Sequence, residues 1–366
     1  MTEVKDPKGY LAPCGLLAFI ALGAFLFFCC RAGPPNQVQR DSPLNLGTNA
    51  VLYDAQDVDL IASLGSPGKV GARVTYYWSD IEPIEGKWQF GVYDDLVKRA
   101  TDANIPLLGI LAYAMKRVSV AAVDMQGDPW ALSFCPPDDI EKFATFAGTV
   151  AARYPQVRYW EIWNEPNLAY FWRPSPDPAR YVELLKRSYA AVKAANPNAV
   201  VVLGGLSTGV ENGPMNAVSF LDSVYRDGGK NYFDAVGFHP YNGTSPDSYL
   251  ADYVNRLHDV MTPYEDGNKP VWVTEISWPV GPGANALSEA QQADYLGRSF
   301  AILHNLTFVE RVYWYNLKDY SNPSIPVIPS PASACGPGVG IPLDYGLFRY
   351  DGSPRPAADA FKKAFK

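Results

Sequence analysis

The chain has 366 residues, 48% of them hydrophobic, and a formal net charge of −7 at pH 7. A chain of this length and composition can bury a large core and need not be disordered. It contains no Lys/Arg-rich run and so lacks the basic surface that nucleic-acid binding requires, and we expect no nucleic-acid partner.

The N-terminal segment contains an uncharged apolar run, Leu16–Cys30. With the four residues before it, the run approaches the ~20 residues that a membrane-spanning helix needs. A cleaved signal peptide is the alternative, because Ala32 could stand just before a cleavage site. Arg31 and two cysteines crowd that site, so we favour an uncleaved N-terminal hydrophobic helix that anchors the protein. Both interpretations export the rest of the chain, which is then either membrane-anchored or secreted.

The chain divides into an anchor or signal segment at residues 1–33, a Pro-rich linker at 34–44 and one folded domain at 45–366. Within this domain, eight predicted strands alternate with predicted helices. The strands are apolar on both faces, as strands covered on both sides must be. They span residues 45–51, 72–78, 105–113, 157–163, 199–205, 233–239, 270–276 and 309–315.

One helix shows clear start and stop signals. It begins at Asp177-Pro178, with an N-cap and a proline at the first position, and it breaks at Asn196-Pro197. Eight such strand-helix units predict an α/β fold of the (β/α)8 TIM barrel type. An open, doubly wound sheet is the competing architecture.

The barrel places its active site at the C-terminal ends of the strands. The fourth strand ends in EIWNEPN (161–167), and the seventh ends with Glu275. Because strands four and seven face each other across the barrel mouth, we expect Glu165 and Glu275 to approach to ~5–5.5 Å, the separation found in retaining glycosidases. Such a pair works when one carboxyl stays protonated and the other stays ionised.

Other strands supply partners for this pair. His239 and Tyr241 end the sixth strand and can hold a carboxylate or a sugar hydroxyl. Trp314 in the eighth strand offers an apolar plate for a sugar ring, and Arg73 in the second is a cation that can keep a neighbouring carboxylate ionised. We interpret Glu161 as a structural carboxylate in the barrel interior.

The combination of WNEPN on strand four, TE on strand seven, HPY on strand six and a Trp on strand eight resembles the clan A retaining glycoside hydrolases, especially families 5 and 39. The resemblance covers nearly the whole barrel. It implies that Glu165 is the acid/base, Glu275 the nucleophile and Asn164 a donor to the sugar 2-hydroxyl. The implied function is a glycosidase that hydrolyses O-glycosyl bonds of a poly- or oligosaccharide. Many family 5 members carry a His where this chain has Tyr113 and Trp163, which favours the family 39 side.

Two other functions remain open on the sequence. GLSTG matches the G-x-S-x-G nucleophile elbow of serine hydrolases, with Ser207 as nucleophile. That elbow needs a helix to begin at once, whereas residues 210–214 are typical of a loop. A catalytically inactive, membrane-tethered carbohydrate-binding barrel is the second alternative.

The sequence also yields expectations about cofactors and cross-links. Three scattered His without ligand spacing lead us to expect no metal or other cofactor, and we expect a monomer. Specificity should lie in the long loops 114–138 and 317–344. Cys135 and Cys335 lie in these loops and can pair in an exported domain, with two unpaired thiols as the alternative.

Overall fold

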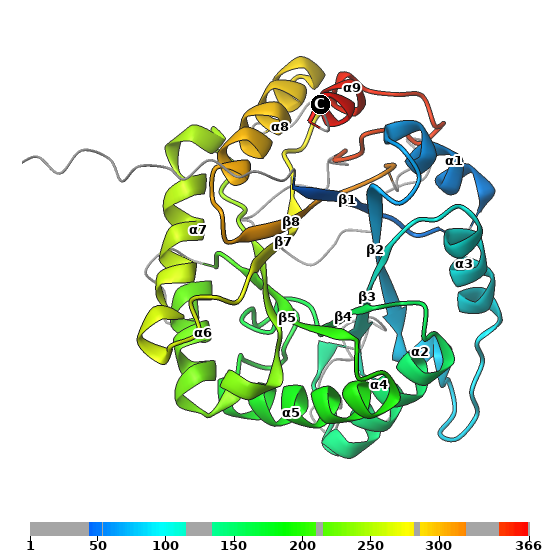
Figure 1. The fold of residues 1–366 in the computed structure, drawn as a ribbon, viewed down its shortest axis with the longest axis vertical. Coiled ribbons are helices and arrows are strands. Elements are labelled where there is room, and N and C mark those ends of the chain that lie inside the picture. Colours follow the sequence, from blue (N-terminus) through cyan, green and yellow to red (C-terminus); the bar gives the residue numbers. More distant parts are fainter. Residues whose placement is uncertain are drawn as a thin grey trace, which may run out of the picture. The chain divides into compact units, whose positions relative to one another are not determined.

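The computed structural model describes residues 44–52, 54–114, 134–209, 215–281, 286–319 and 344–364. Within these ranges the chain forms a closed barrel of eight parallel strands, in which β8 pairs back onto β1 (Figure 1). This confirms the predicted (β/α)8 architecture, and the doubly wound alternative is wrong.

The strands follow the chain in sequence order around the barrel. They are β1 (Asn45–Asn49), β2 (Val70–Tyr77), β3 (Leu107–Ala112), β4 (Tyr159–Ile162), β5 (Val200–Ser207), β6 (Ala235–His239), β7 (Val271–Ile276) and β8 (Val309–Trp314). Each predicted strand is present, with ends that differ by a few residues.

Helices surround the barrel (Figure 1). They are α1 (Ala55–Leu64), α2 (Trp78–Ile81), α3 (Gly91–Asp102), α4 (Ile140–Arg153), α5 (Pro178–Ala195), α6 (Ala217–Arg226), α7 (Leu250–Asp259), α8 (Glu289–His304) and α9 (Pro356–Lys363). The described residues also form the 3₁₀ turns η3 (Gly229–Tyr232), η4 (Pro246–Ser248) and η5 (Thr262–Tyr264).

Helix α5 begins and ends where the sequence signals predict. The Asp177 side chain accepts a hydrogen bond from Arg180 N, Pro178 occupies the first turn, and Asn196 caps the C-terminal end. A capping side chain of this kind satisfies one of the backbone donors that a helix N-terminus leaves without a partner.

A layer of apolar side chains, two of them aromatic, fills part of the barrel interior. One cluster, separate from the main core between strands and helices, consists of Leu108, Val202, Ala235, Trp272 and Tyr313. Glycine is required beside these rings, because a Cβ on Gly47 would lie 2.5 Å from the Tyr313 ring. The polar residues of the interior therefore gather nearer the C-terminal ends of the strands.

The predicted anchor at residues 1–33 and nearly all of the linker at 34–44 lie outside the described residues, as do most of the two long loops. Within the described ranges, no helix has the length and apolarity needed to cross a membrane. Cys135 is fully buried, and Cys335 lies outside the described residues, so their pairing stays a prediction.

Candidate active site

Glu165, just after β4, and Glu275, in β7, line the same cavity of about 300 Å³. The backbone after β4 is bent sharply: Trp163 has φ 69° and Glu165 has φ 46°, values that non-glycine residues seldom adopt. Glu165 N donates to the Gly205 carbonyl at 3.0 Å, which helps to hold this conformation. Sparsely populated backbone conformations of this kind cluster at functional sites.

Glu275 is held by two donors. Arg73 Nη1 donates to its Oε1 at 2.5 Å, and the Tyr241 hydroxyl donates to its Oε2 at 3.1 Å. Burial raises the pKa of Glu275 above its ordinary value, while the Arg73 charge and the Tyr241 hydrogen bond offset part of the rise. These two contacts favour the ionised carboxylate.

Glu165 has a different set of neighbours. Its Oε1 lies 2.8 Å from His239 Nδ1. Burial and the charge of Glu275 raise the pKa of Glu165 well above its ordinary value, and Arg73 and the Ser207 hydroxyl offset only part of this. Burial and the Arg73 charge lower the pKa of His239 well below its ordinary value, so the imidazole is neutral. A proton therefore resides preferentially on Glu165.

Arg73 connects the residues of this site. Its guanidinium donates to Glu161 Oε2 at 2.6 Å, to Asn49 Oδ1 at 2.8 Å and to Asn164 Oδ1 at 2.9 Å, besides Glu275. Burial opposes its charge, but Glu161 and Glu275 outweigh this and raise the pKa of Arg73 above its ordinary value. Arg73 is thus a permanent cation inside the barrel.

The comparison with known proteins agrees with this geometry. Residues 120–325 match the family model described as the glycosyl hydrolase catalytic core. The chain belongs to this glycosyl hydrolase family.

Solved structures with the same barrel carry glycoside hydrolase titles. A family 39 glycoside hydrolase from Bacteroides cellulosilyticus WH2 gives a TM-score of 0.65 at 24% identity, covering 88% of this chain and 63% of that one. A family 39 β-xylosidase from Caulobacter crescentus gives 0.65 at 18% identity, covering 88% and 71%. A GH5_18 protein from Streptomyces cattleya, in complex with GlcNAc, gives 0.62 at 16% identity, covering 88% and 79%. At these identities the likeness shows the fold, and this chain spans less than two thirds of the first structure's length.

The structure of this glycosyl hydrolase brings six of the seven predicted site residues together. Arg73, Asn164, Glu165 and Glu275 line the cavity, while His239 and Tyr241 bond to the two glutamates. Trp314 is placed differently. It is fully buried, donates its Nε1 to Tyr345 O at 3.0 Å and packs against Trp278.

The prediction of Trp314 as a sugar plate is therefore wrong, and its neighbour Tyr315 lines the cavity instead. Successive residues of a strand point to opposite faces, so an error of one position exchanges core for cavity. Sequence reasoning also missed the aromatic wall formed by Tyr77, Tyr113 and Phe171. A search for aromatic residues at the C-terminal end of each strand would have found Tyr77, the last residue of β2, and Tyr113, the residue after β3.

The serine-hydrolase elbow is not formed. Ser207 ends β5, and Thr208 and Gly209, the described residues that follow it, are not helical; the next described helix, α6, begins at Ala217. The Ser207 side chain lowers the pKa of Glu165, and the Ser207 backbone N–H and C=O both bond the Asn167 side chain. Ser207 thus belongs to the surroundings of Glu165.

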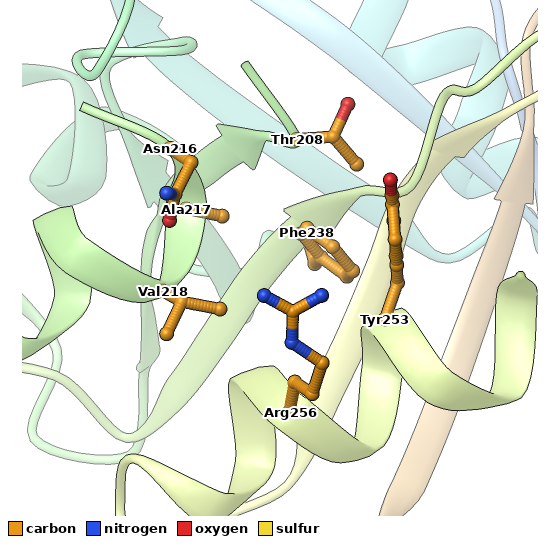
Figure 2. Close-up of a pocket in the computed structure, with 7 residues that line it drawn as sticks. All are labelled: Thr208, Asn216, Ala217, Val218, Phe238, Tyr253 and Arg256. Carbon is orange, nitrogen blue, oxygen red and sulfur yellow. The ribbon is translucent and has the colours of Figure 1, made fainter. Parts of the chain in front are cut away.

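A second hollow, of about 30 Å³, lies between α6 and α7, as Figure 2 shows. This volume has room only for water and is too small for a sugar. Its lining residues are Thr208, Asn216, Ala217, Val218, Phe238, Tyr253 and Arg256. The cavity with the two glutamates is the candidate active site because it brings both carboxyls together.

Proposed function

We propose that this protein is a retaining glycosidase that cleaves O-glycosidic bonds of a poly- or oligosaccharide, with Glu165 as acid/base and Glu275 as nucleophile. One observation carries the proposal. The two carboxyls share one cavity, but Arg73 and Tyr241 hold Glu275 while neutral His239 contacts Glu165. This asymmetry supplies the acid and the anion that glycoside hydrolysis needs.

The reaction follows from these two states. Ionised Glu275 attacks the anomeric carbon while protonated Glu165 gives its proton to the leaving oxygen, which forms a glycosyl-enzyme ester. Glu165, now ionised, takes a proton from water as the water attacks the same carbon and releases Glu275. Each of the two displacements inverts the anomeric carbon, so the configuration is retained overall.

The cavity wall supports sugar binding. Arg73 fixes the side-chain oxygen of Asn164, so its amide group is oriented to donate to a sugar hydroxyl. Tyr113 and Phe171 lie nearly parallel, with an interplanar angle of 11°, and offer apolar faces beside the carboxyls. Flat apolar walls with a few placed polar groups are typical of sites for small ligands.

The substrate is open to a direct screen. Among the similar structures, one is a β-xylosidase and another is a protein in complex with GlcNAc. We propose testing aryl glycosides and oligosaccharides of both sugar types first. Wild-type protein that binds a glycan but turns over none of the panel would favour the inactive carbohydrate-binding alternative.

The two glutamates should fail differently when removed. Glu275→Ala removes the nucleophile, so hydrolysis of every substrate should stop. Glu165→Ala deletes proton donation, so unactivated glycosides should lose roughly 10²–10⁴-fold in rate, whereas the first step on dinitrophenyl glycosides survives. We would measure steady-state kinetics on both substrate classes.

Added azide distinguishes the roles further. Glu165→Ala should yield the glycosyl azide of retained configuration, and Glu275→Ala the inverted one, because azide enters from the face that the carboxylate left empty. The opposite pattern would exchange the two roles. An inverted sugar from the wild type, observed by NMR, would contradict the retaining mechanism.

A further inference from the structure

Glu161 is a third carboxylate inside the barrel, four residues before Glu165 on β4. It is fully buried, and its two oxygens accept three hydrogen bonds from three other strands. A buried charge is costly unless it is paired and fully hydrogen-bonded, as this one is. The reaction described above does not use it.

One carboxylate oxygen of Glu161 is linked through Arg73 to the proposed nucleophile, Glu275. Oε2 accepts from Arg73 Nε at 2.6 Å, and the other end of the same guanidinium donates to Glu275 at 2.5 Å and to Asn164 at 2.9 Å. Because the guanidinium is planar and rigid, fixing Nε fixes the directions of both Nη groups. Glu161 therefore determines where Arg73 holds Glu275.

The other carboxylate oxygen of Glu161 is linked through Gly205 and Thr274 to the proposed acid, Glu165. Oε1 accepts from Gly205 N at 2.7 Å and from the Thr274 hydroxyl at 3.0 Å. The Gly205 carbonyl accepts from Glu165 N, and Thr274 Oγ1 lies 3.1 Å from His239 Nε2, whose other nitrogen contacts Glu165. A Cβ on Gly205 would lie 2.1 Å from His239 Nε2, so only glycine permits this approach.

We propose that Glu161 is a positioning residue for both glutamates, holding Arg73 against Glu275 and holding Gly205 and Thr274, with His239, around Glu165. The inference rests on the proposed function of these two residues. Its geometric basis is that one carboxylate bonds to strands β2, β5 and β7 at once, so both reacting groups share a single buried support.

The charge of Glu161 has a defined effect on the pair. It raises the pKa of Glu165 and that of Glu275, in each case in addition to the larger effect of burial. Within the described residues, the other charged or titratable groups around the pair are Arg73 and Tyr77 from β2, Tyr113 just after β3, His239 at the end of β6, Tyr241 just after it, and Tyr315 just after β8. Glu161→Gln removes one negative charge from this set and leaves the others.

The test is the pH profile of kcat/KM for the full-length Glu161→Gln protein on an aryl glycoside. Without the negative charge, both carboxyls ionise at lower pH. The acid and alkaline limbs should therefore both move down, by on the order of 1 pH unit. The value at the optimum should fall roughly 10²-fold, the effect of a small misplacement of reacting groups.

Glu310→Gln is the matched control. It makes the same change at the start of β8, where Glu310 accepts from Trp272 Nε1 at 3.0 Å beside the apolar cluster of the barrel. Its profile should keep both limbs in place. A folded Glu161→Gln protein whose limbs do not move, or move apart, would overturn the proposal.

Glu161→Asp gives an answer even when Glu161→Gln does not fold. Aspartate keeps the charge but is one methylene shorter and cannot reach Arg73 and Gly205 together, so both limbs should stay while kcat/KM falls. Wild-type kcat/KM would overturn the positioning role. Failure of the proposed function would be recognised by a different result, namely that Glu275→Ala still turns over substrate. In that case the inference about Glu161 would fail as well.

Discussion

At the scale of single residues, the protonation states of the two glutamates differ because their neighbours differ. Glu275 has a cation and a hydroxyl as donors, whereas Glu165 has a neutral imidazole and a serine. Burial raises the pKa of both above the ordinary 4.5, and further for Glu165. Activity should therefore be lost as pH falls through the pKa of Glu275 and as it rises through that of Glu165.

Tyr241→Phe tests one half of this scheme. Its hydroxyl stabilises ionised Glu275, so its loss should move the acid limb of kcat/KM to higher pH and leave the alkaline limb in place. A hydrogen bond to a charged group contributes about 1.5–3 kcal/mol, so kcat/KM should fall roughly 10–100-fold. Tyr225→Phe is the control, because Tyr225 makes a similar bond to Asp266. An acid limb that stays in place would contradict the assigned role of Tyr241.

At the scale of elements, the apolar runs of the sequence were sufficient to predict all eight strands and the circular order of the barrel. The strand ends were harder. β4 stops at Ile162, one residue before its predicted end, because Trp163 adopts a left-handed conformation. No residue type in WNEPN indicates that bend.

A second limit on prediction lies in β7. Thr274 and Glu275 are consecutive, yet both bond to the interior network, where strict alternation would place them on opposite faces. The pairing of β7 with β8 shifts register between Val273 and Ile276, which permits this. A hydropathy pattern does not reveal such an irregularity. The sequence therefore could not predict that Arg73 bonds both Glu161 and Glu275.

Arg355 shows how elements at the end of the chain are joined. Its guanidinium bonds Asp319 just after β8 at 2.6 Å, Asp344 at 3.2 Å and Glu289 at the start of α8 at 3.1 Å. Asp319 and Asp344 bound the long segment that follows β8. Arg355 therefore fixes both ends of that segment next to α9.

Arg355→Met should destabilise the fold by about 3–5 kcal/mol, because it leaves the buried Asp319 without its cation. Denaturant unfolding measures this. Arg187→Met is the comparison, since Arg187 pairs with Glu141 on the exposed faces of α5 and α4 and should contribute only ~0–1 kcal/mol. Equal losses in the two variants would contradict the importance of burial at Arg355.

At the scale of the whole molecule, we propose that the barrel and the N-terminal segment have separate tasks. The described residues that line the candidate site lie between Asn49 and Tyr315. The hydrophobic segment at residues 1–33 is expected only to hold the protein at a membrane. Catalysis and attachment should therefore be separable.

A chain that begins at Val38 should fold, keep the kcat/KM of the full-length protein and remain in the supernatant after membranes are sedimented. The full-length chain should sediment with the membranes. Native protein whose N-terminal residue is Gly33 would instead show that the segment is a cleaved signal peptide. Loss of folding in the shortened chain would contradict the separation of tasks.

The apolar cluster inside the barrel affects how the candidate site responds to ionic strength. Arg73 and Glu161 are 2% and 0% exposed and stand above the layer of Trp272 and Tyr313, where dissolved ions have no access. At physiological ionic strength, salt screens interactions between exposed charges more than about 8 Å apart but screens buried pairs far less. The two limbs of the pH profile should therefore shift only slightly between dilute buffer and strong brine. The pH range over which the protein is active should then be nearly the same in fresh and in saline surroundings.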